Sequence, residues 1–233
     1  MRRRALGLFL LLGALLILTL APNVAGHGVD EGDAAFLEEN QGANVGAFIR
    51  LGAEHMVTGY DHLLFLAGVV FFLYQPRDVV HYVTAFTIGH SATLLLGVLG
   101  GIEANAYLID AVIGLSVVYK GFDNLGGFKQ IIGVQPNTKA AVLIFGLFHG
   151  FGLATKLQEL ALSQEGLVVN MLSFNLGVEI GQAIALVAIL AVLLLWRQHS
   201  KFREHAVVAN TLLMAGGFIL TGYQLAGYLM GGA

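Results

Sequence analysis

The sequence predicts an all-α fold, a polytopic membrane helix bundle. Of its 233 residues, 57% are hydrophobic and only 12% are charged, and the mean hydropathy is +0.77. A soluble domain carries about twice that charged fraction. The apolar residues also fall into runs long enough to cross a bilayer, which favours a membrane protein over a large water-soluble core.

The first 26 residues have the layout of a secretory signal peptide. Three arginines at 2–4 precede an apolar stretch at 5–20, and small residues follow. This order predicts cleavage at the end of the segment, and the alternative is an uncleaved first transmembrane helix. An acidic extracytoplasmic segment over 27–44 then leads into a transmembrane domain over 45–230.

Six transmembrane helices are expected after the signal peptide. The apolar runs that predict them are 60–74, 79–99, 104–119, 140–160, 167–196 and 206–230. A shorter apolar run, 45–58, is interrupted by Arg50, Glu54 and His55. Because these polar residues interrupt it, we expect a short interfacial or re-entrant helix there and not a full span.

The distribution of basic residues predicts the orientation of the bundle. If the mature N-terminus lies outside, the inner loops carry seven basic residues and the outer segments carry two. The inner ones are Arg77, Lys120, Lys129, Lys139, Arg197, Lys201 and Arg203, and the outer ones are Arg50 and Lys156. Cytoplasmic loops are enriched in lysine and arginine. Both mature termini are therefore expected on the extracytoplasmic side of a bacterial inner (plasma) membrane.

Polar side chains recur within these spans in five clusters. A charged group at the centre of a transmembrane helix costs about 2.5–3.5 kcal/mol on insertion scales, so each one needs a partner or a function. The clusters contain Glu54, His55, Asp61 and His62; Thr87, His90, Ser91 and Thr93; Asp110; His149; and Asn175, Glu179 and Gln182.

The first cluster favours a metal site. His55 and His62 are seven residues apart, so on a continuous helix they share one face, two turns apart. Asp61 would lie to one side unless Gly59 breaks the helix and redirects it. Two imidazoles and a carboxylate suit a divalent metal of borderline softness. The alternative is that these side chains cap helices at the membrane interface.

The clusters of His90 and Asp110 each leave two interpretations open. His90 stands among hydroxyls, including Ser91, and either binds metal or is hydrogen-bonded in the core. Asp110 either orients a metal-binding histidine or pairs with a charge elsewhere. The glycines that flank His149 admit a close approach of another backbone.

The last cluster follows one stripe of a helix. Asn175, Glu179 and Gln182 are spaced i, i+4 and i+7, which is typical of an ion pathway or of a polar seam between helices. With a rise of about 1.5 Å per residue, the topology puts His62 near the outer surface and His149 near the middle of the membrane. The site is therefore expected to open to the outside.

Four segments carry a resemblance to a known family. They are HMVTGYDHLLFL at 55–66, FTIGHSATLLL at 86–96, FGLFHGFGLA at 145–154 and SFNLGVEIGQ at 173–182. These segments resemble the second branch of the HupE/UreJ family of hydrogenase and urease accessory membrane proteins. The resemblance implies a secondary permease for nickel, or for cobalt. The metal ligands that it implies are His55, Asp61, His62, His90, His149 and Glu179, and the supporting residues are Glu54, Ser91, Asp110, Asn175 and Gln182.

We therefore expect a metal permease and not an enzyme. His55, Asp61 and His62 would capture the ion outside, and the remaining ligands would carry it inward. The absence of cysteine argues against a soft Cu(I) path. Nickel, or alternatively cobalt or zinc, would be the substrate, with no permanently bound cofactor.

The sequence also indicates which partners to expect and which other functions are compatible with it. No phosphate-binding G-x-x-x-x-G-K-[ST] motif is present, so no nucleotide is expected as a partner. No nucleic acid is expected as a partner either. The expected partners are the lipid bilayer and the metal ion, and a homo-oligomer is compatible with the sequence. The alternative function is an intramembrane zinc-dependent hydrolase that uses the His/Asp cluster. The spread of the ligands along the pore favours the permease. A metal sensor or storage subunit ranks last.

Overall fold

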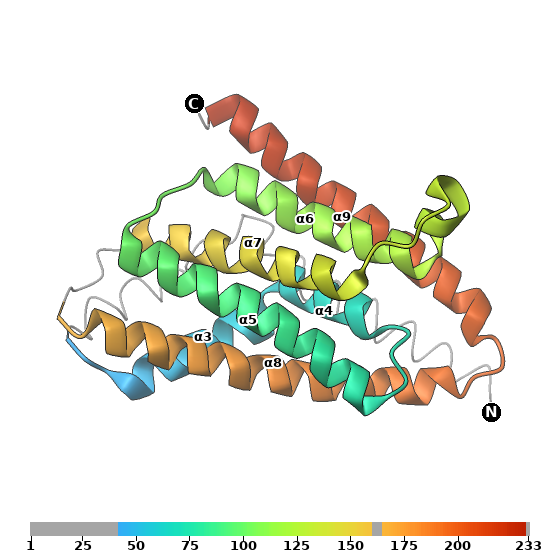
Figure 1. Ribbon diagram of the computed structural model, residues 1–233, viewed down its shortest axis with the longest axis horizontal. Helices are drawn as coiled ribbons and strands as arrows, with labels where there is room; N and C mark the ends of the chain where they lie inside the picture. The colour runs from blue at the N-terminus through green and yellow to red at the C-terminus, as the bar shows by residue number, and fades with distance from the viewer. Residues whose placement is uncertain (1–41, 160–164, 232–233) are drawn as a thin grey trace.

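The described part of the chain, residues 42–159 and 165–231 of a computed structural model, contains helices and no strand. The predicted signal peptide and most of the acidic segment lie outside these residues. The helices are α3 (Val45–Thr58), α4 (Tyr60–Val70), α5 (Pro76–Gly100), α6 (Ala106–Asn124), a single π-turn (η2, Phe128–Ile132), α7 (Thr138–Glu159), α8 (Leu167–Arg197) and α9 (Phe202–Gly231) (Figure 1).

Four of these helices are long and apolar enough to cross a membrane. They are α5, α8 and α9 over their whole length and α7 over Thr138–Gln158. Helix α4 is apolar but has only 11 residues. Helix α6 has 19 residues and carries Asp110, Lys120 and Asp123. The all-α fold is thus confirmed, and four of the six expected spans have the length and hydropathy of a membrane crossing by themselves.

Helix α3 packs along α8, whereas α4 packs mainly against α6 (Figure 1). Beside the start of α8, the Asn44 N–H donates to Asn170 Oδ1 at 2.8 Å. Beside its end, Arg197 Nη2 donates to the Val70 carbonyl at 2.6 Å. We expected residues 45–58 to form an interfacial or re-entrant helix. They form a helix with those bounds, and it packs along α8. Its interfacial or re-entrant position stays a prediction.

Glycines allow the helix pairs to pack backbone against backbone. A Cβ atom at Gly52 of α3 would collide with the backbone of Phe174 in α8. Between α5 and α7, a Cβ atom at Gly150 would collide with the carbonyl of His90. Small residues of this kind let transmembrane helices approach closely. The contact at Gly150 also brings the backbones of His90 and His149 next to each other.

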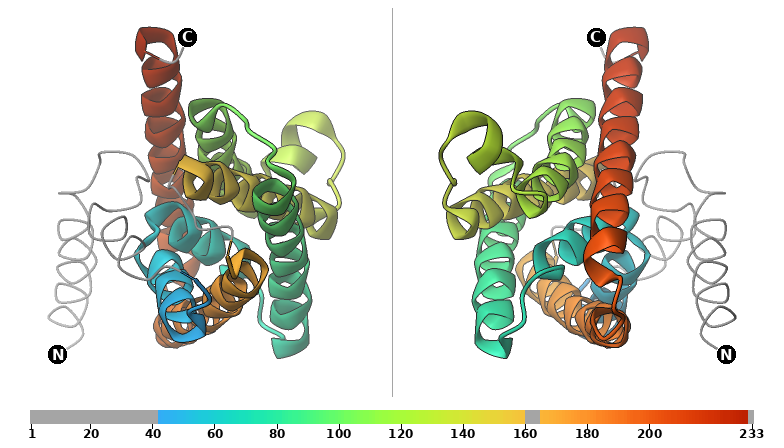
Figure 2. Two further views of the ribbon diagram at one scale, coloured as in Figure 1. Left: turned by 90° about the vertical axis from the view of Figure 1, so that its left-hand side faces the viewer. Right: turned by 90° about the vertical axis from the view of Figure 1, so that its right-hand side faces the viewer.

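Helix α6 packs against both α7 and α9, and α9 stands at the edge of the bundle (Figure 2). α6 continues to Asn124, beyond the expected end at residue 119, and the chain turns at Gly126, which has a positive φ of 72°. Lys120, which we expected in an inner loop, is consequently part of the helix and buried, with 4% of its surface exposed.

Candidate metal centre

A break between α3 and α4 brings a histidine and an aspartate together. Gly59 ends α3 and begins α4 in an extended conformation, with φ −67° and ψ 99°. His55 lies in the last turn of α3, and Asp61 lies in the first turn of α4, where the helix dipole favours a carboxylate. A continuous helix would separate His55 and His62 by about 10 Å along its axis. With the break, their ring centroids are 5.1 Å apart.

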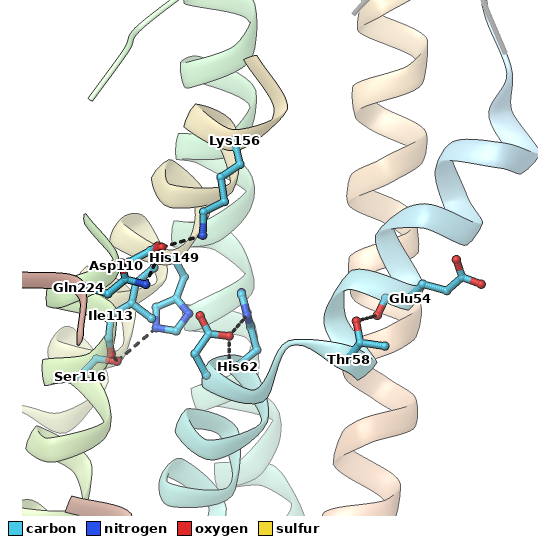
Figure 3. Close-up of polar contacts among 10 residues, drawn as sticks. Glu54, Thr58, His62, Asp110, Ile113, Ser116, His149, Lys156 and Gln224 are labelled. Carbon is cyan, nitrogen blue, oxygen red and sulfur yellow. Dashed lines mark hydrogen bonds and ion pairs between the residues drawn. The ribbon is translucent and has the colours of Figure 1, made fainter. Parts of the chain in front are cut away.

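His62 lies at the centre of a cluster of four histidines from four helices. Its ring centroid is 4.9 Å from that of His149 and 5.9 Å from that of His90. His62, His90 and His149 are buried, with 3%, 1% and 1% of their surfaces exposed, and His55 is half-buried. We expected His62 near the outer surface, away from His149, but the two rings are neighbours (Figure 3).

Asp61, His62 and His149 are arranged so that one metal ion could contact all three. Each offers a ligand atom, and these atoms lie within 4.8 Å of one another. All three side chains are buried. Within residues 42–159 and 165–231, no other group of three histidines and carboxylates meets this geometry. Imidazole nitrogen with carboxylate oxygen suits nickel, cobalt or zinc.

A hydrogen bond orients the ring of His62 for metal binding. Its Nδ1 lies 2.8 Å from Asp61 Oδ1, which also accepts the His62 backbone N–H at 2.6 Å. Because a carboxylate only accepts, Nδ1 of the neutral ring carries the hydrogen. The lone pair that a metal requires is therefore on Nε2.

Ser116 of α6 orients the ring of His149 in the same way. The Ser116 hydroxyl donates its only hydrogen to the Ile113 carbonyl at 2.6 Å. Its oxygen therefore accepts from His149 Nε2, which lies 3.2 Å away, and the lone pair of His149 is on Nδ1 (Figure 3). Such outer hydrogen bonds fix the tautomer and direction of metal-binding histidines.

His90 lies beside this group, with its ring centroid 5.9 Å from that of His62. In the described part of the chain, neither ring nitrogen of His90 has a hydrogen-bond partner, and the same holds for the buried hydroxyl of Ser91. An unpaired buried polar group costs about 1–3 kcal/mol. A metal ion in the cluster would provide His90 with a partner, so the geometry supports His90 as a further ligand.

The polar stripe on α8 does not enter the cluster as a unit. Gln182 is buried, and its Oε1 accepts from Thr87 at 2.8 Å, one turn of α5 from His90. Asn175 is half-buried, and its Oδ1 has no partner among the described residues. Glu179 is exposed. It does not belong to the group of Asp61 and the two histidines.

Two carboxylates that we expected to support the ligands are engaged elsewhere. Asp110 Oδ2 accepts from Lys156 Nζ at 2.7 Å and from Gln224 Nε2 at 3.3 Å. Asp110 is thus an ion-pair partner, the second of the two interpretations left open by the sequence. Glu54 pairs with Arg50 at 2.8 Å on the exposed side of α3, away from the cluster (Figure 3).

Sequence reasoning missed two residues of this region. Ser116 stands in an apolar run, and no spacing marks it as the partner of His149. Lys156 was predicted at the outer end of the span 140–160. Asp110 was predicted near the outer end of the span 104–119. Because both therefore lie near the same end of the predicted bundle, their opposite charges could have been matched.

Comparison with known proteins gives one match. A family model described as HupE / UreJ protein matches residues 31–231. No curated protein and no solved structure matches the chain.

Proposed function

Because the chain belongs to the HupE/UreJ family, we propose that it is a membrane permease for a divalent transition-metal ion, nickel first and cobalt as the alternative. The family is associated with nickel/cobalt accessory membrane function. The observation that carries the proposal is the buried group of Asp61, His62 and His149, whose ligand atoms lie within 4.8 Å of one another. His55 and His90 complete the cluster.

In this proposal the chain crosses the membrane six times. The first crossing consists of α3 and α4 together, since Asn44 before α3 is bonded to Asn170 near the start of α8 and Val70 at the end of α4 is bonded to Arg197 at its end. Ion sites of membrane transporters are commonly built at such broken helices. The mature N-terminus and the C-terminus lie outside. In this orientation the loops that are rich in lysine and arginine face the cytoplasm of a bacterial cell.

The geometry changes the path that we inferred from the sequence. We expected His55, Asp61 and His62 to form an outer station and His90, His149 and Glu179 to form a deeper one. The histidines instead converge on His62, so we assign them to one binding site. A role of Glu179 in the path stays a prediction, which its own variant tests.

The same convergence favours a second candidate function, an intramembrane zinc-dependent hydrolase. Such an enzyme needs three protein ligands in one place and an open fourth position for water. Asp61, His62 and His149 meet the first requirement. The permease remains the stronger proposal because the HupE/UreJ family is a transporter and accessory family.

Uptake of radioactive nickel into proteoliposomes separates these functions. For the wild type we expect saturable uptake that competes with cobalt, and for His62→Ala we expect background uptake. The matched control is His81→Ala, which removes an exposed histidine of α5 and should keep wild-type uptake. Metal binding without uptake, together with hydrolysis of a lipid amide by the zinc-loaded protein, would favour the hydrolase. A wild type that neither binds nor transports nickel or cobalt would overturn the permease.

A further inference from the structure

The bundle contains a second polar region, which we call the inner cavity. It has a volume of about 230 Å³, and its lining residues include Val69 of α4, Leu73 just after that helix, Lys120 and Asp123 of α6, Gln135 and Thr138. Gln135 is exposed, so the cavity reaches the surface there. It lies at the end of the bundle where α6 and α8 end and α7 begins.

Two helices connect the inner cavity to the histidine cluster. On α4, Val69 follows His62 by seven residues, and on α6, Asp123 follows Ser116 by seven residues. Seven residues of helix rise about 10 Å. Both helices therefore put the cavity about two turns below the cluster, on the side of the basic inner loops.

An aromatic layer separates the two polar regions. Phe65 lies on α4 between His62 and the cavity and is 2% exposed. Its ring centroid is 5.4 Å from that of Phe86, 5.8 Å from that of Phe145 and 5.2 Å from that of His149. A hydrated ion cannot pass between rings in such contact, so this conformation is closed below the cluster.

The inner cavity holds a carboxylate that is already neutralised by a cation of the protein. Asp123 Oδ2 accepts from Lys120 Nζ at 2.7 Å, and both side chains are buried, with 7% and 6% of their surfaces exposed. Gln135 Nε2 donates to Asp123 Oδ1 at 2.5 Å, and the Thr138 hydroxyl donates to Oδ2 at 3.5 Å. An ammonium group thus occupies the place beside Asp123 where a metal cation would bind.

We propose that the inner cavity is the lower half of the metal path and that Asp123 is a second, weaker cation site within it. This proposal rests on the proposed permease function. The ion would reach Asp123 when Phe65 moves, and Lys120 would take the place of the ion again when it leaves. Oxygen donors hold nickel or cobalt less tightly than imidazoles do, which suits a site of release.

The number of bound metal ions tests this second site. Removal of one partner from a buried ion pair leaves an uncompensated charge, which attracts a cation. Lys120→Gln should therefore raise the nickel bound at equilibrium from one ion per chain to two, measured on purified protein by equilibrium dialysis. The double variant Lys120→Gln/Asp123→Asn, in which neither charge remains, should return to one. His62→Ala/Lys120→Gln should also bind one, at Asp123.

The outcomes separate this inference from the permease proposal. If the wild type binds one nickel ion and Lys120→Gln also binds one, the second site is wrong and the permease stands. If the wild type binds and transports no nickel or cobalt, the permease itself fails. Two bound nickel ions per chain in both Lys120→Gln and the double variant would show that Asp123 is not the ligand.

Cysteine accessibility tests the cavity without changing a charge. The chain has no cysteine, so one introduced thiol reports on a single position. Val69 and Leu66 are equally buried, with 5% and 4% exposed, but only Val69 lines the cavity. A membrane-impermeant maleimide should label Val69→Cys from the cytoplasmic side and reduce nickel uptake to background. Leu66→Cys should remain unlabelled. Equal labelling of both variants, or of neither, would overturn the proposal.

Discussion

The histidine cluster and the inner cavity are two polar regions of one apolar bundle, and their carboxylates have different neighbours. In the cluster, Asp61 lies among imidazoles, and its ligand atom lies within 4.8 Å of those of His62 and His149. In the cavity, Asp123 is paired with the ammonium of Lys120. In the proposed path the cluster would therefore hold an ion, whereas the cavity would exchange one cation for another.

The largest difference between the two regions is expected when the same substitution is made in each of them. Asp61→Asn removes a ligand charge and the acceptor that orients His62, so we expect the affinity for nickel to fall about 100-fold. Asp123→Asn leaves the cluster intact, so we expect the affinity of that site to change less than about twofold while nickel uptake slows. Calorimetric titration of the purified variants measures the affinities, and proteoliposome uptake measures the rates.

Either variant can contradict the comparison by itself. If Asp61→Asn binds nickel with wild-type affinity, Asp61 is not part of the binding site. If Asp123→Asn takes up nickel at the wild-type rate, the inner cavity is not part of the metal path. Because both changes replace a buried carboxylate by an amide of the same shape, a difference between them reflects the position and not the kind of substitution.

The local helices were largely predictable from the sequence, and the contacts between them were not. Residues 45–58 form a helix with the expected bounds. Gly59 interrupts the helix before Asp61, and a Cβ atom there would come within 3.0 Å of the His55 carbonyl and of His62 Nδ1. The sequence could not tell that α3 would lie along α8 while α4 turns toward α6. The packing partners of a helix depend on which helices the glycines bring together. The spacing of residues within one segment does not identify those partners.

Side-chain surroundings were the least predictable feature. The spacing of Asn175, Glu179 and Gln182 correctly assigns them to one stripe of α8. It does not tell which edge of that stripe another helix covers, and only Gln182 is fully buried. Lys120 was expected in solvent because α6 was expected to end earlier, so its pairing with Asp123 was missed.

A smaller effect should come from the hydrogen bond that orients His149. Ser116→Ala removes the acceptor of His149 Nε2 and leaves the ligands in place, so we expect the affinity for nickel to fall about tenfold. The control is Thr211→Ala, which removes an exposed hydroxyl that bonds only to its own helix. An affinity equal to that of the wild type would mean that packing alone orients the ring. The stoichiometry of Lys120→Gln should not respond to Ser116→Ala, because Ser116 lies in the other region.

The smallest effect is expected at Glu179. Its side chain is exposed on α8 and does not share the metal geometry of Asp61, His62 and His149. We therefore expect Glu179→Gln to change the equilibrium affinity for nickel less than about twofold, within the range of surface substitutions. Uptake by the same variant is the sharper measurement. Unchanged affinity with a strongly reduced uptake would assign Glu179 to the path, as the resemblance implies, but in another conformation of the bundle. Loss of affinity would instead require Glu179 to reach the cluster, which contradicts the arrangement of α8 described above.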